Sequence, residues 1–335
     1  MSKRALNYGE NPQQTGAVLA TPGSTDALGI PRFTMPDGTP ALEGAASMSW
    51  ATLKALDTGL EAITRIAACL EKNVGAVPKI AVLITHGTPF AACVGSTDQV
   101  INRAIQSNFR AAFGSFLVTN VELSEPVAYK VRQWMGPDRP FLGLAAPRID
   151  AAAAPYFVRK KGKCHLLMNE ALGTLGVASL AREDVSHTVR GATLSQMPNP
   201  FLPEFPADWD ASLRQDMSVA WGVCAASASS SITVANDGML IANASGHIER
   251  AAAAEMAILQ AKVAGRVEML EGAAVCSDSF FSFADALDPL ARRKVKAIFA
   301  THGSVHDDEV RAHAREFDVI FHTVPDREGR IFYGH

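Results

Sequence analysis

Residues 79–95, with the sequence KIAVLITHGTPFAACVG, restrict the fold more than any other stretch of this chain. The first half is a continuous apolar run bounded by turn residues, a pattern typical of a strand buried on both faces. The run ends at Thr85-His86-Gly87, so the strand would present His86 at its carboxyl end, where open α/β sheets bind ligands. The small residues that follow could open a helix. The stretch predicts an α/β fold with a histidine in a ligand-binding position.

A second stretch near the end of the chain has the same form. Residues 295–310, VKAIFATHGSVHDDEV, again combine an apolar run, Thr-His-Gly and a polar segment that could begin a helix. Both His86 and His302 would follow buried strands. The repetition predicts two similar lobes that face one site.

The composition excludes several classes of protein. The chain has 335 residues, 48% of them apolar, and a net charge of −3, which suits a globular protein of two domains. There is no basic stripe for nucleic acid and no run of about 18 apolar residues for a membrane span. The amino terminus lacks the apolar core of a secretory signal, so a cytoplasmic location is expected. Five scattered cysteines without a CxxC motif are expected to be buried free thiols: Cys69, Cys93, Cys164, Cys224 and Cys276.

Periodicity along the chain predicts alternating helices and strands. Apolar residues recur every three or four positions after Ser49, and Asn236-Asp237-Gly238 is a strong hairpin turn. Helices are predicted over residues 49–67, 96–109, 126–135, 209–227, 249–264, 285–294 and 305–316. Strands are predicted over 79–85, from after Gly114 to 120, and over 141–146, 272–276, 295–300 and 318–323, with a hairpin over 229–243. This division predicts a first lobe with an amino-terminal arm (1–150), a connector (151–205) and a second lobe (206–335).

An aromatic stretch, Ser277–Asp285, has the sequence SDSFFSFAD. Three phenylalanines beside two aspartates are unusual in a loop. One interpretation is a hydrophobic plug that closes the second lobe. The other is an aromatic wall for a planar ligand, with a carboxylate at its edge.

His86 and His302 are the best acid–base candidates, because histidine titrates near neutral pH and both would lie at strand ends. The zinc motifs HExxH and H-x-E with P-C-x-x-C are absent. The glycine-rich nucleotide motifs and the G-x-S-x-G of nucleophile-elbow hydrolases are absent as well. The sequence therefore favours acid–base chemistry by histidine, without a metal.

Five motifs, in the correct order, resemble the transformylase domain of the bifunctional purine-biosynthesis enzyme. That enzyme formylates aminoimidazole carboxamide ribonucleotide (AICAR) and closes the ring to IMP. The matching stretches are Leu6–Gln14 (LNYGENPQQ), Thr85–Pro89 (THGTP), Ala112–Ser115 (AFGS), Ser277–Asp285 (SDSFFSFAD) and Gly303–Val310 (GSVHDDEV). The similarity begins near Leu6 and implies a stand-alone transformylase domain that lacks the cyclohydrolase domain.

The resemblance implies two cytidine-deaminase-like, three-layer α/β/α lobes without their zinc. It also implies a homodimer with active sites at the interface, and formyl transfer from 10-formyltetrahydrofolate to a small-molecule amine. His86 would take part in proton transfer at that amine. Phe280, Phe281 and Asp285 would lie near the folate or the formyl group.

The chain departs from the family pattern at several implied site residues. Asn7 stands where the family has a phosphate-contacting arginine, followed by Tyr8 and Gly9 in the acceptor-binding motif. Thr85 replaces the lysine beside the catalytic histidine, and Ser230 replaces a functional asparagine.

Arg330 matches the carboxy-terminal arginine of the family, whereas the family's later histidine falls on Gly334. The resemblance thus assigns catalysis to His86, Thr85 and Ser230. Two hypotheses follow: a formyltransferase for AICAR or an AICAR-like acceptor, or an inactive paralogue that binds a nucleotide or folate as a regulator or partner subunit. A hydrolase on the same scaffold is a third, weaker hypothesis.

Overall fold

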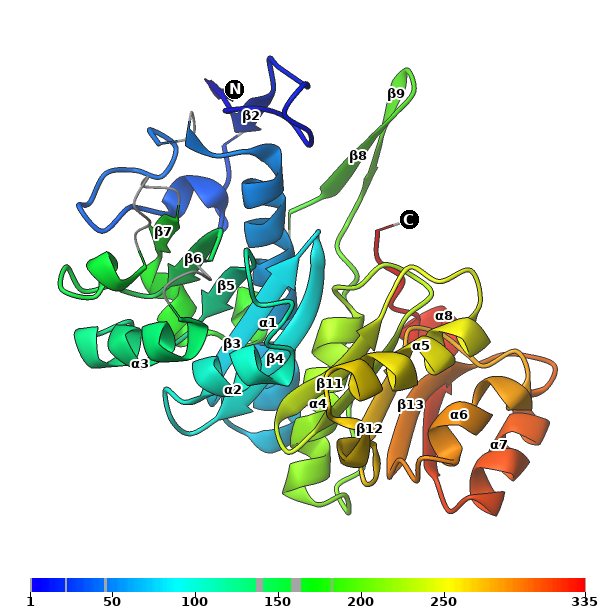
Figure 1. Cartoon of the computed structure of the whole chain (residues 1–335). Coiled ribbons are helices and arrows are strands. Elements are labelled where there is room, and N and C mark those ends of the chain that lie inside the picture. Colours follow the sequence, from blue (N-terminus) through cyan, green and yellow to red (C-terminus); the bar gives the residue numbers. More distant parts are fainter. Residues whose placement is uncertain are drawn as a thin grey trace.

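One large mixed sheet runs through the computed structural model, which describes residues 2–21, 23–44, 47–136, 141–157, 164–181 and 183–334 (Figure 1). Its ten strands lie in the order β14 (Ile320–Pro325), β13 (Ala297–His302), β12 (Ala274–Ser277), β10 (Ile232–Asn236), β11 (Met239–Ala244), β4 (Thr88–Gly95), β3 (Lys79–Thr85), β5 (Phe116–Thr119), β6 (Gly143–Ala146) and β7 (His165–Met168). The fold is α/β, as the sequence predicts.

The sheet consists of two halves with the same strand order. Counted outwards from the central β4–β11 junction, the first half runs β4, β3, β5, β6, β7 and the second runs β11, β10, β12, β13, β14. In each half an antiparallel hairpin is followed by three mutually parallel strands. The two Thr-His-Gly motifs are not equivalent in this repeat. His86 follows β3, which belongs to the hairpin of the first half, whereas His302 ends β13, one of the parallel strands of the second half.

A strand, β4, follows His86, so the helix expected after Gly87 is wrong. His86 and Gly87 form a two-residue turn and both have left-handed backbone angles, with φ of +49° and +70°. Two successive left-handed residues give the turn whose twist matches that of a β-hairpin. The chain therefore reverses directly, and Thr88 pairs with Thr85.

Helices cover both faces of the sheet (Figure 1). Alternate residues of β3 illustrate this arrangement, since Val82 and Ile84 pack into one apolar core while Ala81 and Leu83 pack into the other. The first core contains α1 (Trp50–Val74) and α4 (Ala211–Cys224). The second contains α2 (Val100–Ser107), α3 (Glu125–Met135), α5 (Arg250–Val263), α6 (Asp288–Ala291) and α7 (Asp307–Glu316). The result is three layers.

Local signals set the ends of the long helix α1. Ser49 accepts a hydrogen bond from the Thr52 amide at 3.3 Å, and Gly75 ends the helix with a φ of +82°. α1 and α4 cross closely, since a Cβ added at Gly222 would lie 2.6 Å from the Ile66 nitrogen. A side chain at Gly222 would push the two helices apart.

The remaining elements lie at the periphery. β1 (Ser2–Ala5) pairs with β2 (Val18–Thr21), α8 (Asp326–Gly329) follows β14, and β8 (Val185–Val189) with β9 (Ala192–Gln196) forms a hairpin that projects from the molecule (Figure 1). β7 lies in the stretch predicted as connector and completes the first half-sheet; the domain boundaries stay a prediction. Among the described residues, no helix has both the length and the apolar character needed to cross a membrane.

Candidate functional site

Several of the residues that the sequence singles out lie at one edge of the sheet, whereas Asn7, Tyr8 and Gly9 lie on the amino-terminal arm. Strands β3, β11, β12, β13 and β14 end at this edge, and β4 and β10 begin there, because β4 runs antiparallel to both β3 and β11. We call it the His86 edge. The His86 turn, Ser230 and His302 lie at this edge. The loop that contains Phe280 and the tail that contains Arg330 lie there as well. The opposite edge carries the β10–β11 turn and is called the Asp237 edge.

His86 lies at the tip of the β3–β4 hairpin and is exposed. No described side chain or backbone group is hydrogen-bonded to its imidazole, so both ring nitrogens are open to a ligand. Thr85, the preceding residue, is half-buried and carries a hydroxyl rather than a charged group. The hairpin therefore presents an imidazole without a neighbouring ammonium group.

Ser230 lies across the junction, at the start of the second half-sheet. Its amide donates to the His247 carbonyl at 3.1 Å, and the His247 amide donates back to the Ser230 carbonyl at the same distance. The neighbouring Ser229 amide donates to the Tyr333 carbonyl at 3.3 Å. The Ser230 backbone is thus fixed from two sides, by the segment after β11 and by the carboxy-terminal tail.

A buried ion pair, missed by the sequence analysis, holds the aromatic loop. Arg250 contacts Asp278 at 2.5 Å, with side chains 11% and 0% exposed, and donates to the Phe280 carbonyl at 2.7 Å. The second oxygen of Asp278 accepts from the Ser231 amide at 3.0 Å. Arg250 occupies the first turn of α5, where the helix dipole disfavours a cation. An arginine at this unfavourable position is a signal in the sequence, but it does not identify Asp278 as the partner.

The phenylalanines divide between the two interpretations of the aromatic stretch. Phe281 is 1% exposed and packs edge-on against Phe321 at 6.1 Å, as a plug would. Phe280 is half-buried, and Phe283 is 59% exposed with its ring 5.2 Å from that of His306. Asp285 is exposed in the turn that follows.

Asp326 is a hydrogen-bonding centre beside this loop. Its carboxylate accepts from Thr301 at 2.5 Å and from Ser279 at 2.7 Å, and it forms an ion pair with Arg330. Burial raises the pKa of Asp326, but the hydrogen bonds from Arg330, Thr301 and Ser279 outweigh burial and leave it lowered. The Arg330 guanidinium also lies 5.0 Å from the ring of Phe332, so it is already engaged by two groups.

The amino-terminal arm contacts the start of α1. The Asn7 amide donates to the Met48 carbonyl at 2.9 Å, and the Trp50 amide donates to the Tyr8 carbonyl at 3.3 Å. Gly9 closes a turn with Gln14 at 2.8 Å. Among the described residues, no hydrogen bond or ion pair joins Asn7, Tyr8 or Gly9 to His86.

Other reactive groups do not form a second centre in the described parts of the chain. His302 shares a 3.2 Å hydrogen bond with Thr323, and no three His, Cys, Asp or Glu side chains gather as metal ligands would. All five thiols are buried. Burial raises the pKa of Cys69 to about 12 and that of Cys93 to about 11, which makes both poor nucleophiles.

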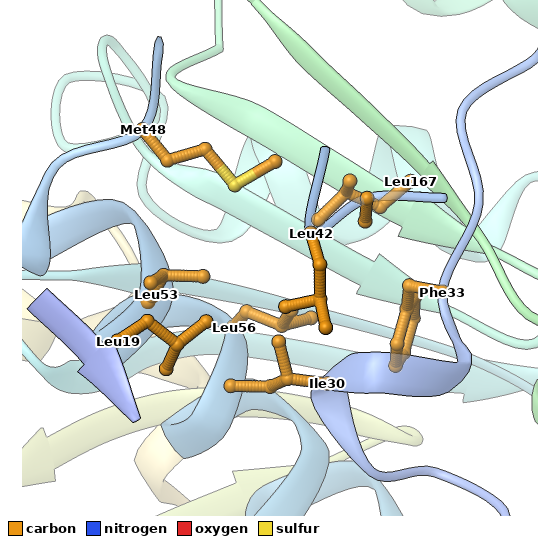
Figure 2. Close-up of a pocket in the computed structure, with 9 residues that line it drawn as sticks. Leu19, Ile30, Phe33, Leu42, Met48, Leu53, Leu56 and Leu167 are labelled. Atoms are coloured by element: carbon orange, nitrogen blue, oxygen red, sulfur yellow. The ribbon is translucent and has the colours of Figure 1, made fainter. Parts of the chain in front are cut away.

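A small hollow lies away from these residues, between the amino-terminal arm, α1 and β7. Figure 2 shows that its walls are apolar side chains: Leu19, Ile30, Phe33, Ala41, Leu42, Met48, Leu53, Leu56 and Leu167. The described residues that line it supply no polar group to orient a ligand. The hollow belongs to the packing of the arm on the first half-sheet.

Comparison with known proteins places these features in a family context. A family model described as AICARFT/IMPCHase bienzyme matches residues 1–260. The bifunctional purine biosynthesis protein PurH of Thermotoga maritima is 27% identical over 256 residues, which cover 74% of this chain and 51% of that protein. PurH of Anoxybacillus flavithermus is 26% identical over 95% of the chain, and PurH of Mycobacterium ulcerans is 27% identical over 96%; each match covers 57% of the relative. The chain thus spans about half the length of these curated relatives.

Proposed function

Because the chain belongs to the AICARFT/IMPCHase bienzyme family, we propose that it is a folate-dependent formyltransferase. It would move a formyl group from 10-formyltetrahydrofolate to the amine of AICAR or of an AICAR-like acceptor. The buried thiols are compatible with a reducing, cytoplasmic setting for this chemistry.

The unengaged imidazole of His86 is the observation that carries the proposal. The acceptor amine attacks the formyl carbon, which forms a new C–N bond and a tetrahedral oxyanion. His86 takes a proton from the attacking amine, as a general base at the tip of an exposed hairpin can. Collapse breaks the bond between the formyl carbon and N10 of the folate, and the departing nitrogen takes the proton that His86 removed from the amine. The formylated acceptor and tetrahydrofolate are then released.

The other residues at the His86 edge would bind and orient the two substrates. Ser230 and Thr85 would contact the reacting amine from opposite sides of the β4–β11 junction. The Arg250–Asp278 pair fixes the Phe280 carbonyl. Phe280 would contact the folate, with Asp285 at the rim of the loop and Phe281 supporting it from the core.

Asn7, Tyr8, Gly9 and Arg330 would complete the acceptor site. The arm residues lie beside the start of α1, and Arg330 extends from the carboxy-terminal tail. We also propose the cytidine-deaminase-like relation of the two lobes and a homodimer with sites at its interface, both of which follow from the family resemblance.

Two observations favour the inactive paralogue as a second candidate. Thr85 carries no positive charge to support the reacting groups, and Arg330 is bound to Asp326. A protein with these features would bind a nucleotide or folate as a regulator or partner subunit.

The test is turnover of 10-formyltetrahydrofolate with a panel of amines that includes AICAR. The full chain, His86→Ala and the control His302→Ala are compared, and titration calorimetry measures folate and AICAR binding for each. Turnover that is lost in His86→Ala but kept in His302→Ala supports the transferase. Binding without turnover of any amine, by a folded protein, refutes it and supports the regulator.

A further inference from the structure

The two half-sheets are joined by β4 and β11, and their backbone pairing lies near the Asp237 edge. Met239 pairs with Cys93, and the Val94 amide donates to the Gly238 carbonyl at 2.7 Å. Both strands continue towards the His86 edge, but within the described residues no further ladder pair joins them. Backbone hydrogen bonds between these two strands therefore do not hold the His86 hairpin against the second half-sheet.

The side chain of Asn243 spans this unpaired part of the junction. It lies on β11 and is 5% exposed. Its amide nitrogen donates to the Pro89 carbonyl of β4 at 2.6 Å and to the Ser227 hydroxyl at 2.9 Å. The Asn243 backbone is itself fixed by Gln260, which accepts from its amide at 3.0 Å.

These two bonds link the His86 hairpin to the Ser230 segment. Pro89 follows His86 by three residues, across a two-residue turn that leaves little freedom between them. Ser227 precedes Ser230 by three residues, and the amide of Gly246 donates to the Ala228 carbonyl at 2.7 Å within the same segment. One carboxamide thus spans the distance between the two sides of the candidate site.

The oxygen of the same carboxamide argues against a role in packing alone. Asn243 Oδ1 is buried and has no hydrogen-bond partner among the residues that the structure describes. An unpaired buried acceptor destabilises a folded protein, whereas an apolar residue in a buried strand avoids that cost. The side-chain NH₂ group of Asn243, which donates to Pro89 and Ser227, is therefore the reason for a polar residue at this position.

We propose that Asn243 is a positioning residue, which holds the β3–β4 hairpin so that His86 faces the Ser230 side of the site. Its effect on catalysis rests on the proposed function, but its effect on the hairpin does not. A shift of the hairpin would misplace the base without removing it, and misplacement by about 1 Å can slow a reaction roughly 100-fold.

Hydrogen exchange followed by mass spectrometry tests the effect on the hairpin directly. The full chain is compared with Asn243→Val, which removes the donor, and with the matched control Ser227→Ala, which removes only the other acceptor. We expect the amides of residues 85–91 to exchange at least about 10-fold faster in Asn243→Val and within about 2-fold of the parent in Ser227→Ala. Unchanged protection in Asn243→Val, or an equal increase throughout both half-sheets, overturns the proposal.

A measurement on the parent protein keeps the proposal falsifiable if Asn243→Val does not fold. In protein labelled with ¹⁵N-asparagine, the side-chain amide protons of Asn243 should exchange slowly, because both are donated to buried acceptors. Rapid exchange of these protons in the folded protein overturns the proposal.

Kinetics separate the positioning role from the proposed function. If the parent transfers formyl groups, Asn243→Val should lower kcat at least about 10-fold, with KM for both substrates within about 3-fold. A KM increase with unchanged kcat overturns the positioning of His86. If the parent has no transferase activity, the proposed function fails, while the exchange data still decide whether Asn243 holds the hairpin.

Discussion

The β3–β4 and β10–β11 hairpins occupy equivalent places in the two half-sheets and have nearly the same backbone. His86 and Gly87 have φ of +49° and +70°, and Asp237 and Gly238 have +52° and +68°. Each hairpin also has a one-residue bulge at the same distance from its turn, at Phe90 and Ile241.

The surroundings of the two turns differ sharply. Asp216 of α4 accepts from the Asp237 and Gly238 amides at 3.1 and 2.6 Å, and Arg103 donates to the Asp237 carbonyl and carboxylate at 2.6 and 2.7 Å. The imidazole of His86 has no such partner among the described residues. The same type of turn is thus held by hydrogen bonds to α2 and α4 at the Asp237 edge, whereas at the His86 edge it exposes an imidazole without a hydrogen-bond partner among the described residues.

The largest expected effect is the loss of catalytic activity on substitution of His86. His86→Ala should lower the proposed formyl transfer at least about 100-fold, because it removes the proposed general base, and should leave the thermal unfolding midpoint nearly unchanged. Asp237→Ala, at the equivalent position, should keep most of the activity. Steady-state rates and thermal melts of both variants check this. Equal losses of activity would mean that the two turns do not differ in function.

The glycines of the two turns should differ in their effect on stability. Gly238→Ala places a Cβ 2.8 Å from the Val94 carbonyl oxygen, whereas a Cβ at Gly87 meets nothing within 4 Å. Both changes strain a left-handed residue and should lower the free energy of unfolding by about 1 kcal/mol. The additional clash should raise the loss in Gly238→Ala to roughly 3–4 kcal/mol. Urea unfolding measures both values, and equal losses would contradict the close contact at the junction.

The contact of Asp216 with the Asp237-Gly238 turn should also make the free energy of unfolding depend on pH. Burial raises the pKa of Asp216 from 3.8 to about 6, although the amides of Gly238 and Asp237 partly oppose it. Because the folded protein binds this proton more tightly, the contribution to stability is present below about pH 4 and is lost as the pH rises through about 6. Asp216→Asn removes the dependence, worth roughly 2–3 kcal/mol.

Urea unfolding of the parent and Asp216→Asn between pH 4 and pH 8 checks this dependence. The variant should gain stability relative to the parent as the pH rises to about 6, and the difference should be constant above about pH 7. A stability difference between parent and variant that does not change with pH would show that the pKa of Asp216 is not raised.

The smallest effect is expected from the exposed ion pair. Arg103 and Asp237 have side chains 34% and 78% exposed, so solvent screens their attraction. Arg103→Ala should reduce stability by about 0.5–1 kcal/mol, and a double-mutant cycle with Asp237→Ala should give a coupling energy below about 1 kcal/mol. A larger coupling would mean that the pair, rather than Asp216, holds this turn.

Much of the secondary structure followed from the sequence because its signals are local. The strand Lys79–Thr85 was predicted with the observed bounds, and the Asn236-Asp237-Gly238 turn gave the second hairpin. The equivalent turn at His86 was missed, since Thr-His-Gly lacks the asparagine or aspartate that usually marks such a turn. The short strands β7, β8 and β9 were missed as well, because they lie in the irregular stretch 151–205 that was predicted as a connector.

The candidate site was predictable in part. The sequence placed His86 at the end of a buried strand, and the motifs supplied the family. It gave no reason to join Arg250 to Asp278 or Asn243 to Pro89, since each pair meets only when distant segments pack.

By itself the sequence predicted most strands of the large sheet, the position of His86 after the strand Lys79–Thr85, and the motifs that the chain shares with its family. These depend on neighbouring residues and their periodicity. Only the tertiary structure decided that the hairpin of His86 repeats that of Asp237, that Phe281 is buried while Phe280 is accessible, and that one asparagine spans the junction. Those outcomes depend on strand order and on the close packing of residues far apart in the chain, which no local pattern encodes.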